Sequence, residues 1–170
     1  MTDYKLLCET VEGYCQNEPS AFPLLSNISS VIYDELEDLN WAGFYLLRKK
    51  DTKEYVSADF LKEGIDKGQF ELVVGPFQGK PACIRIPIGK GVCGSACEEM
   101  KVFRVEDVHT FPGHIACDCA SNSEIVVPLM KEGEVYGVLD IDSPILNRFT
   151  IEDEEGLKKL ASIIDNAINF

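Results

Sequence analysis

Residues 123–142 read SEIVVPLMKEGEVYGVLDID, and this stretch decides the fold. Two largely apolar runs, residues 124–130 and 135–141, lie on either side of the dipeptide Glu132-Gly133. Apolar runs separated by a short loop that contains glycine are typical of an antiparallel β-hairpin. The sequence therefore predicts two neighbouring strands near the carboxyl end of an antiparallel sheet.

The predicted hairpin brings three carboxylates together. In an antiparallel pair the start of the first strand lies beside the end of the second, so Glu124 should lie near Asp140 and Asp142. Asp140 and Asp142 are two residues apart and point to the same face of an extended strand. One interpretation is three solvated acids at the ends of strands. The other is a proton-sharing cluster in which crowding raises at least one pKa, so that a neutral carboxyl can donate a proton.

Outside the hairpin, the pattern of apolar residues predicts helices at both ends of the chain. Apolar residues recur with helical spacing over residues 20–39, and Thr150 and Asp153 have the spacing of a capping box at the start of a last amphipathic helix. Between them the sequence predicts strands at residues 41–48, 70–74, 83–87 and 102–105, a further strand near 55–60, and a short helix at 92–100. These elements indicate a single α+β domain over residues 1–170, with helices packed on an antiparallel sheet of about six strands.

Composition limits the classes of function. Sixteen basic against 29 acidic residues give a net charge of −13, which repels nucleic-acid backbones and anionic membrane surfaces. No apolar run approaches the roughly 20 residues that span a bilayer. The first residues, MTDYKLLCETVEG, lack the basic and apolar regions of a secretory signal. We therefore expect a cytoplasmic protein with no nucleic-acid or membrane partner.

Seven cysteines are more than packing requires in a domain of this class. They are Cys8, Cys15, Cys83, Cys93, Cys97, Cys117 and Cys119. The odd number argues against a secreted disulfide scaffold, and the absence of a C-x2-C pair makes a zinc site poorly supported. Cys93 lies two residues after Gly91, at the start of the predicted short helix, where the helix dipole would favour a thiolate. Cys83, Cys93 and Cys117 are the candidates for thiol-dependent redox chemistry.

Five segments of the chain resemble one known family closely. They are NWAGFYL (residues 40–46), GPFQGKPACIRIPIGKGVCG (75–94), DVHTFPGHIACD (107–118), SEIVVPL (123–129) and GVLDIDSP (137–144). These segments resemble the free methionine-(R)-sulfoxide reductases, a family of GAF domains. The resemblance implies a GAF fold, a six-stranded antiparallel sheet with helices on both faces. It implies that the enzyme reduces free L-methionine (R)-sulfoxide to L-methionine, as part of the response to oxidative stress.

The resemblance assigns roles to the thiols. Cys117 matches the nucleophile of the family, which attacks the sulfoxide sulfur and becomes a sulfenic acid. Cys83 and Cys93 match the other redox cysteines, with Cys83 the favoured resolving partner, although the choice between them stays open. Cys119 is additional to the family pattern and could compete as a disulfide partner. The disulfide would be reduced by an external dithiol, with thioredoxin expected in that role, and neither a bound cofactor nor a metal is implied.

The resemblance also assigns the binding groups. Glu124 and Asp142 match acids that hold the substrate and protonate its oxygen, and Asp140 matches the acid that can pair with the substrate ammonium group. Trp41 and Tyr45 match the aromatic pair that packs on the substrate methyl.

By the same resemblance, the N-terminal helices occupy residues 1–39 and the catalytic core residues 40–170. An insertion of unknown role lies at about residues 49–69, and a homodimer is an expectation. The alternative function is a GAF sensor module that binds a small ligand without catalysis.

Overall fold

The computed structural model describes residues 2–16, 18, 20–113 and 120–168 of the chain. Its centre is a six-stranded antiparallel sheet with the strand order β3-β2-β1-β6-β5-β4. The strands are β1 (Trp41–Lys49), β2 (Phe70–Gly79), β3 (Arg85–Pro87), β4 (Phe103–Val105), β5 (Ser123–Lys131) and β6 (Glu134–Ser143). The predicted antiparallel sheet is confirmed, and β1 and β6 form its middle because their residues are buried on both faces.

The hairpin of β5 and β6 brings together the strand ends that the sequence predicts to be neighbours. Glu132 and Gly133 both have positive φ angles, of 52° and 82°, as a two-residue turn between twisted strands requires. The turn pairs Lys131 with Glu134, and a register shift between Leu129 and Met130 then sets Glu124 directly opposite Asp142. The pairing with β1 then adds Trp41 on the other side of Asp142. Three of the predicted site residues therefore form one row across three strands.

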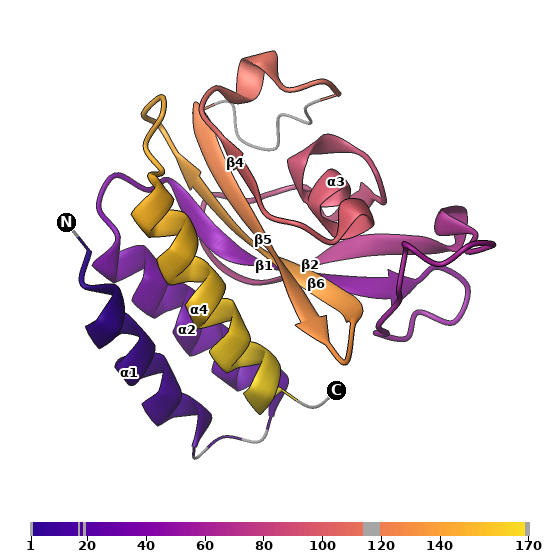
Figure 1. Ribbon diagram of the computed structural model, residues 1–170, viewed down its shortest axis with the longest axis horizontal. Helices are drawn as coiled ribbons and strands as arrows, with labels where there is room; N and C mark the ends of the chain where they lie inside the picture. The colour runs from indigo at the N-terminus through magenta and orange to yellow at the C-terminus, as the bar shows by residue number, and fades with distance from the viewer. Residues whose placement is uncertain (1, 17, 19, 114–119, 169–170) are drawn as a thin grey trace.

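Helices cover both faces of the sheet (Figure 1). On one face lie α1 (Tyr4–Cys15), α2 (Ala21–Glu35) and α4 (Ile151–Ala167), and on the other lies α3 (Gly91–Glu99). The predicted capping box at the start of α4 is present, with reciprocal hydrogen bonds between Thr150 and Asp153. Each face has its own hydrophobic core, so the sheet separates two packed layers.

Two of the predicted strands differ from the structure. The strand predicted at residues 83–87 begins only at Arg85, so Cys83 lies in the connection before it. Residues 55–60 form two isolated bridges, Arg48 with Tyr55 and Ala58 with Val135, instead of a strand. Both segments lie outside the central strands, and they lack the neighbours on both sides that would extend a ladder.

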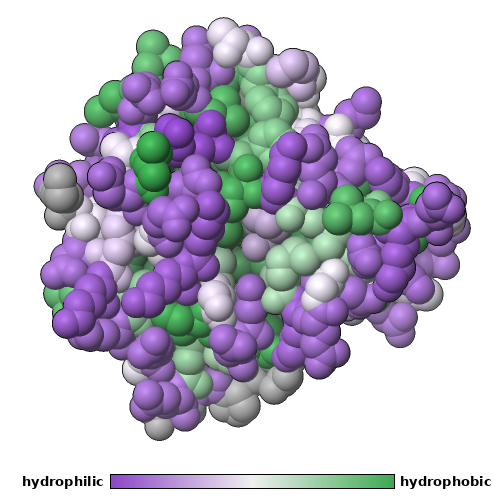
Figure 2. Space-filling model, in the orientation of Figure 1, coloured by the Kyte–Doolittle hydropathy of each residue, from purple (hydrophilic) through white to green (hydrophobic). Residues whose placement is uncertain are grey.

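The surface agrees with the composition. Figure 2 shows a face that is mostly hydrophilic, with hydrophobic residues in scattered groups. Among the described helices, none combines the length and the apolar character needed to cross a membrane.

Candidate active site

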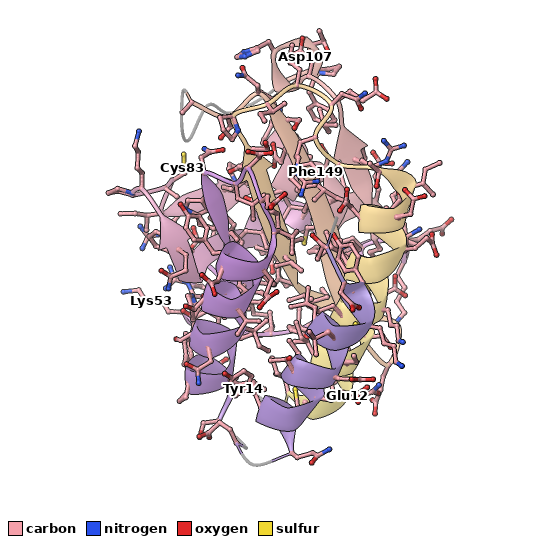
Figure 3. All side chains as sticks on the ribbon, turned by 90° about the vertical axis from the view of Figure 1, so that its left-hand side faces the viewer. Glu12, Tyr14, Lys53, Cys83, Asp107 and Phe149 are labelled. Carbon is pink, nitrogen blue, oxygen red and sulfur yellow. The ribbon has the colours of Figure 1, made fainter. Side chains whose placement is uncertain are left out.

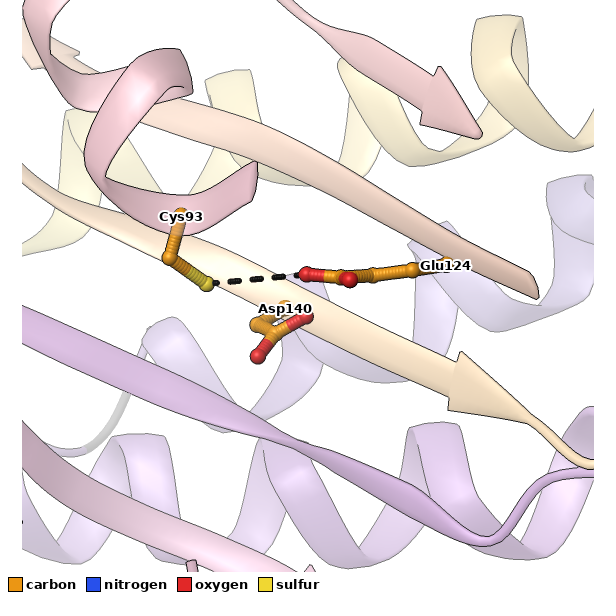
Figure 4. A group of neighbouring side chains, drawn as sticks. All are labelled: Cys93, Glu124 and Asp140. Carbon is orange, nitrogen blue, oxygen red and sulfur yellow. Dashed lines mark hydrogen bonds between the residues drawn. The ribbon is translucent and has the colours of Figure 1, made fainter. Parts of the chain in front are cut away.

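The site is built where α3 crosses the ends of β5 and β6. Cys93 of α3, Glu124 of β5 and Asp140 of β6 are all buried, and their ligand atoms lie within 4.8 Å of one another (Figure 4). The Cys93 thiol donates to Glu124 Oε1 across 3.9 Å. Two of the three predicted acids, Glu124 and Asp140, are therefore buried together rather than solvated, whereas Asp142 is half-buried.

Burial favours the neutral form of these acids. It raises the pKa of Glu124 well above its ordinary value, and the neighbouring charges of Asp140 and Asp142 raise it further. Burial also raises the pKa of Asp140, to about 6, although hydrogen bonds with Cys93 and Glu124 oppose the shift. The pKa is raised further at Glu124 than at Asp140, so the environment favours Glu124 as the proton donor and Asp140 as the anion of the pair.

The structure corrects the expectation of a thiolate at Cys93. This residue is the third of α3, yet burial raises the pKa of its thiol well above the ordinary value, and the charges of Asp140 and Glu124 raise it again. The weak positive end of a short helix cannot offset desolvation and two carboxylates within contact distance. Cys93 is therefore a thiol, and a poor nucleophile, in this structure.

An aromatic wall closes the other side of the site. Trp41 and Tyr45 are both buried and stack with their ring centroids 5.7 Å apart, as the sequence analysis expects of a paired wall. Phe77 of β2, which the sequence analysis missed, stacks on Trp41 with a centroid distance of 5.1 Å. Gly43 is the sequence feature that could have indicated Phe77. It pairs with Phe77 on one side and Asp140 on the other, and a Cβ added to Gly43 would lie 2.3 Å from the Cβ of Phe77. The Trp41 Nε1 atom is buried without a hydrogen-bond partner among the described residues.

Cys83 contacts the aromatic wall through its main chain. It is disulfide-bonded, whereas Cys8, Cys15, Cys93 and Cys97 are free. The Tyr45 hydroxyl donates to the Cys83 carbonyl oxygen across 3.0 Å, a contact that spans 38 residues of sequence.

Figure 3 shows Cys83 toward the same end of the molecule as Asp107, with Glu12 and Tyr14 of α1 at the other end. The predicted nucleophile Cys117, and Cys119 beside it, lie outside the described residues.

A buried ion pair holds the short strand that follows Cys83. Glu71 of β2 accepts from Arg48 at 2.7 Å, and Arg85 of β3 lies 3.4 Å from the same carboxylate oxygen. The main chain adds a hydrogen bond from the Val74 N–H to the Ile84 carbonyl oxygen, at 3.0 Å. The connection that carries Cys83 is thus fixed from both β1 and β2, and neither contact has a signal in the local sequence.

Close backbone packing holds α3 over the sheet. A Cβ added at Gly94 would lie 2.4 Å from the carbonyl oxygen of Pro87, and the Gly89 N–H donates to the Gly94 carbonyl oxygen at 2.9 Å. Only glycine permits this approach. The glycines of the segment 89–94 therefore place Cys93, one residue earlier, against the acids.

The fold and the site define a class, since residues 25–169 match the GAF domain family. The chain is 50% identical to the free methionine-R-sulfoxide reductase of Escherichia coli, covering 89% of this chain and 79% of that one. It is 40% identical to the yeast (Saccharomyces cerevisiae) enzyme of the same name, covering 94% and 82%. A crystal structure of free methionine-R-sulfoxide reductase from Neisseria meningitidis in complex with its substrate superposes with a TM-score of 0.80 at 36% identity, covering 96% and 87%. The chain belongs to the free methionine-R-sulfoxide reductases, a family of GAF domain proteins.

Proposed function

We propose that this protein reduces free L-methionine (R)-sulfoxide to L-methionine in the pocket between α3, the aromatic wall and the row of acids. The Escherichia coli and yeast relatives are named for this reaction. The Neisseria meningitidis enzyme, whose structure contains its substrate, has the same fold. The observation that carries the mechanism is the pair of buried carboxyls, in which burial and the charge of Asp140 raise the pKa of Glu124 and so favour its neutral form. A sulfoxide oxygen leaves only when it is protonated, so a neutral acid is the group that this reaction needs.

In the proposed first step the Cys117 thiolate attacks the sulfoxide sulfur while Glu124 donates a proton to its oxygen. Asp142, opposite Glu124 in the sheet, is the second candidate for this proton donor. The oxygen passes from methionine to Cys117, which becomes a sulfenic acid, and methionine is released. The role of Cys117 rests on the family resemblance.

The second step is the formation of a disulfide. Cys83 attacks the sulfenic sulfur of Cys117 and water leaves, which yields the Cys83–Cys117 disulfide. Support for Cys83 rather than Cys93 comes from two observations: Cys83 is disulfide-bonded, and Cys93 is free with a raised thiol pKa. An external dithiol then reduces the disulfide and becomes oxidised itself. We propose thioredoxin for this role, and no bound cofactor takes part.

Charge at the site accounts for the choice of a free amino acid. Asp140 is the anion that can pair with the substrate ammonium group, and the ring faces of Trp41 and Tyr45 pack on its methyl. A peptide-bound methionine sulfoxide has no ammonium group there, and it would leave Asp140 buried without its partner. An unpaired buried group costs about 1–3 kcal/mol or more, which is enough to exclude that substrate.

Turnover of three substrates tests the proposal. Reduced protein receives free L-methionine (R)-sulfoxide, the S epimer, or the N-acetylated R form, and methionine release is measured. We expect turnover of the free R epimer alone, loss of it in Cys117→Ser, and retention in Cys15→Ser, a half-buried thiol of α1 on the opposite face. Absence of turnover by folded, reduced protein would leave a ligand-binding GAF module as the better account.

A further inference from the structure

The site contains a set of metal ligands that the reductase mechanism does not use as such. A soft thiol from Cys93 and two hard carboxylates from Glu124 and Asp140 converge from three elements, with every pair of ligand atoms within 4.8 Å. In the reaction above, the acids handle a proton and an ammonium group, whereas Cys93 has no step of its own. The neighbouring acids make Cys93 a poor nucleophile. As a thiolate, however, Cys93 can bind a cation together with these two carboxylates.

One oxygen atom in this cluster lacks a partner. Asp140 is 6% exposed, and its Oδ1 atom has no hydrogen-bond partner among the described residues. Buried carboxylate oxygens are nearly always paired with a donor or a cation. In Figure 4 the carboxylate of Asp140 lies beside the Cys93 sulfur and the Glu124 carboxylate, so a cation bound between them would satisfy this oxygen.

We propose that Cys93, Glu124 and Asp140 bind a thiophilic divalent cation, of the zinc or cadmium type, which occupies the ammonium subsite and blocks the enzyme. Tetrahedral zinc with sulfur and oxygen ligands places its ligand atoms about 3.4–3.6 Å apart. The Cys93 sulfur and Glu124 Oε1 are 3.9 Å apart and must close by about 0.3–0.5 Å, while no pair in the cluster, at 4.8 Å or less, must close by more than about 1.4 Å. The fourth position is left for water.

The ligand types select the cation. A thiolate favours zinc, cadmium and cobalt, whereas magnesium and calcium take six or more oxygen ligands and gain nothing from sulfur. Binding releases the protons of Cys93 and Glu124 to solvent. The divalent charge among the three anionic ligands then leaves a net charge near −1, so the bound cation also relieves the crowding of the acids. Because Asp140 would pair either with the cation or with the substrate ammonium, the two exclude each other; only this competition rests on the proposed reductase function.

Cobalt binding tests the site directly. Cobalt(II) is titrated into protein whose Cys83 disulfide is intact, and the sulfur-to-cobalt charge-transfer absorption is recorded. We expect one equivalent to bind, the band to disappear in Cys93→Ala, and the band to persist in Cys97→Ala. Cys97 is the matched control because it is a free, fully buried thiol of the same helix. No band in the native protein, or a band that survives in Cys93→Ala, would overturn the proposal.

Inhibition of a single turnover tests the consequence. Reduced, desalted protein is mixed with zinc and then with substrate, and methionine is measured without added dithiol. Zinc should raise the substrate concentration that gives the half-maximal rate of methionine release. The zinc concentration for half-inhibition should rise at least about tenfold in Cys93→Ala but stay unchanged in Cys97→Ala. Equal inhibition of both variants would place the inhibitory metal on other thiols and refute the proposal. If the protein released no methionine even without zinc, the reductase function would fail while the cobalt titration would still decide the metal site.

Discussion

The Asp140→Asn substitution measures what the acid site does to folding. Burial raises the pKa of Asp140 from 3.8 to about 6. This carboxyl therefore contributes its full share of stability below the lower value, where it is protonated in both states, and loses that share as pH rises through the higher one. The rise of this pKa from 3.8 to about 6 corresponds to about 3 kcal/mol of folding stability that is lost above that range.

Asparagine stays neutral at every pH and avoids this loss. At about pH 8 the variant should be more stable than the native protein by about 1–3 kcal/mol, the lower end allowing for amide hydrogens that need acceptors. At about pH 3 the difference should vanish, because the native carboxyl is then protonated in the folded and the unfolded chain. The same variant should lose substrate affinity, since it no longer pairs with the ammonium group.

Urea unfolding at both pH values measures the effect, and thermal unfolding should show about 2–4 °C per kcal/mol for a chain of this size. Asp34→Asn, in an exposed position of α2 on the other face, is the matched control and should show no such gain. Destabilisation of Asp140→Asn at about pH 8, or a difference that is the same at both pH values, would refute the account of a strained acid site.

Two further substitutions test how the thiols are positioned. Gly94→Ala would place a Cβ 2.4 Å from the Pro87 carbonyl oxygen, so α3 must shift; we expect a loss of about 1–3 kcal/mol in urea unfolding together with lower turnover. Gly13→Ala, where an added Cβ meets no atom within 4 Å, should instead gain up to about 1 kcal/mol, and similar losses at both sites would contradict the argument. Tyr45→Phe removes the 3.0 Å hydrogen bond to the Cys83 carbonyl oxygen; disulfide formation after a single turnover should slow about fivefold with little change in KM, as followed by thiol alkylation and mass spectrometry, and an unchanged rate would deny the hydroxyl a positioning role.

The hairpin shows what the sequence alone can predict. The register shift between Leu129 and Met130, which sets Glu124 opposite Asp142, has no signal in the sequence. The neighbourhood of the acids does have one: two apolar runs around Glu132-Gly133 predict a turn, and the turn brings Glu124 near Asp140 and Asp142. Each step depends on residues that are close in the chain. This is why the sheet, the capping box and the neighbourhood of the acids are all confirmed.

Contacts between distant segments could not be predicted in this way. The raised pKa of Cys93 depends on which strands α3 covers, whereas its position in the sequence shows only the helix start. The hydrogen bond from Tyr45 to Cys83 and the pairing of Arg48 with Glu71 likewise depend on how β1 and β2 are paired. Residue types and spacing carry no information about such neighbours.

The sheet also separates the core that packs against three helices from the core that holds the candidate active site. Among the residues that the structure describes, the core under α1, α2 and α4 shares no buried residue with the core under α3, although both rest on the same strands. Substitutions that improve packing beneath the three helices can therefore accumulate without disturbing the pocket. A protein engineer would therefore raise thermal resistance on that side of the sheet first.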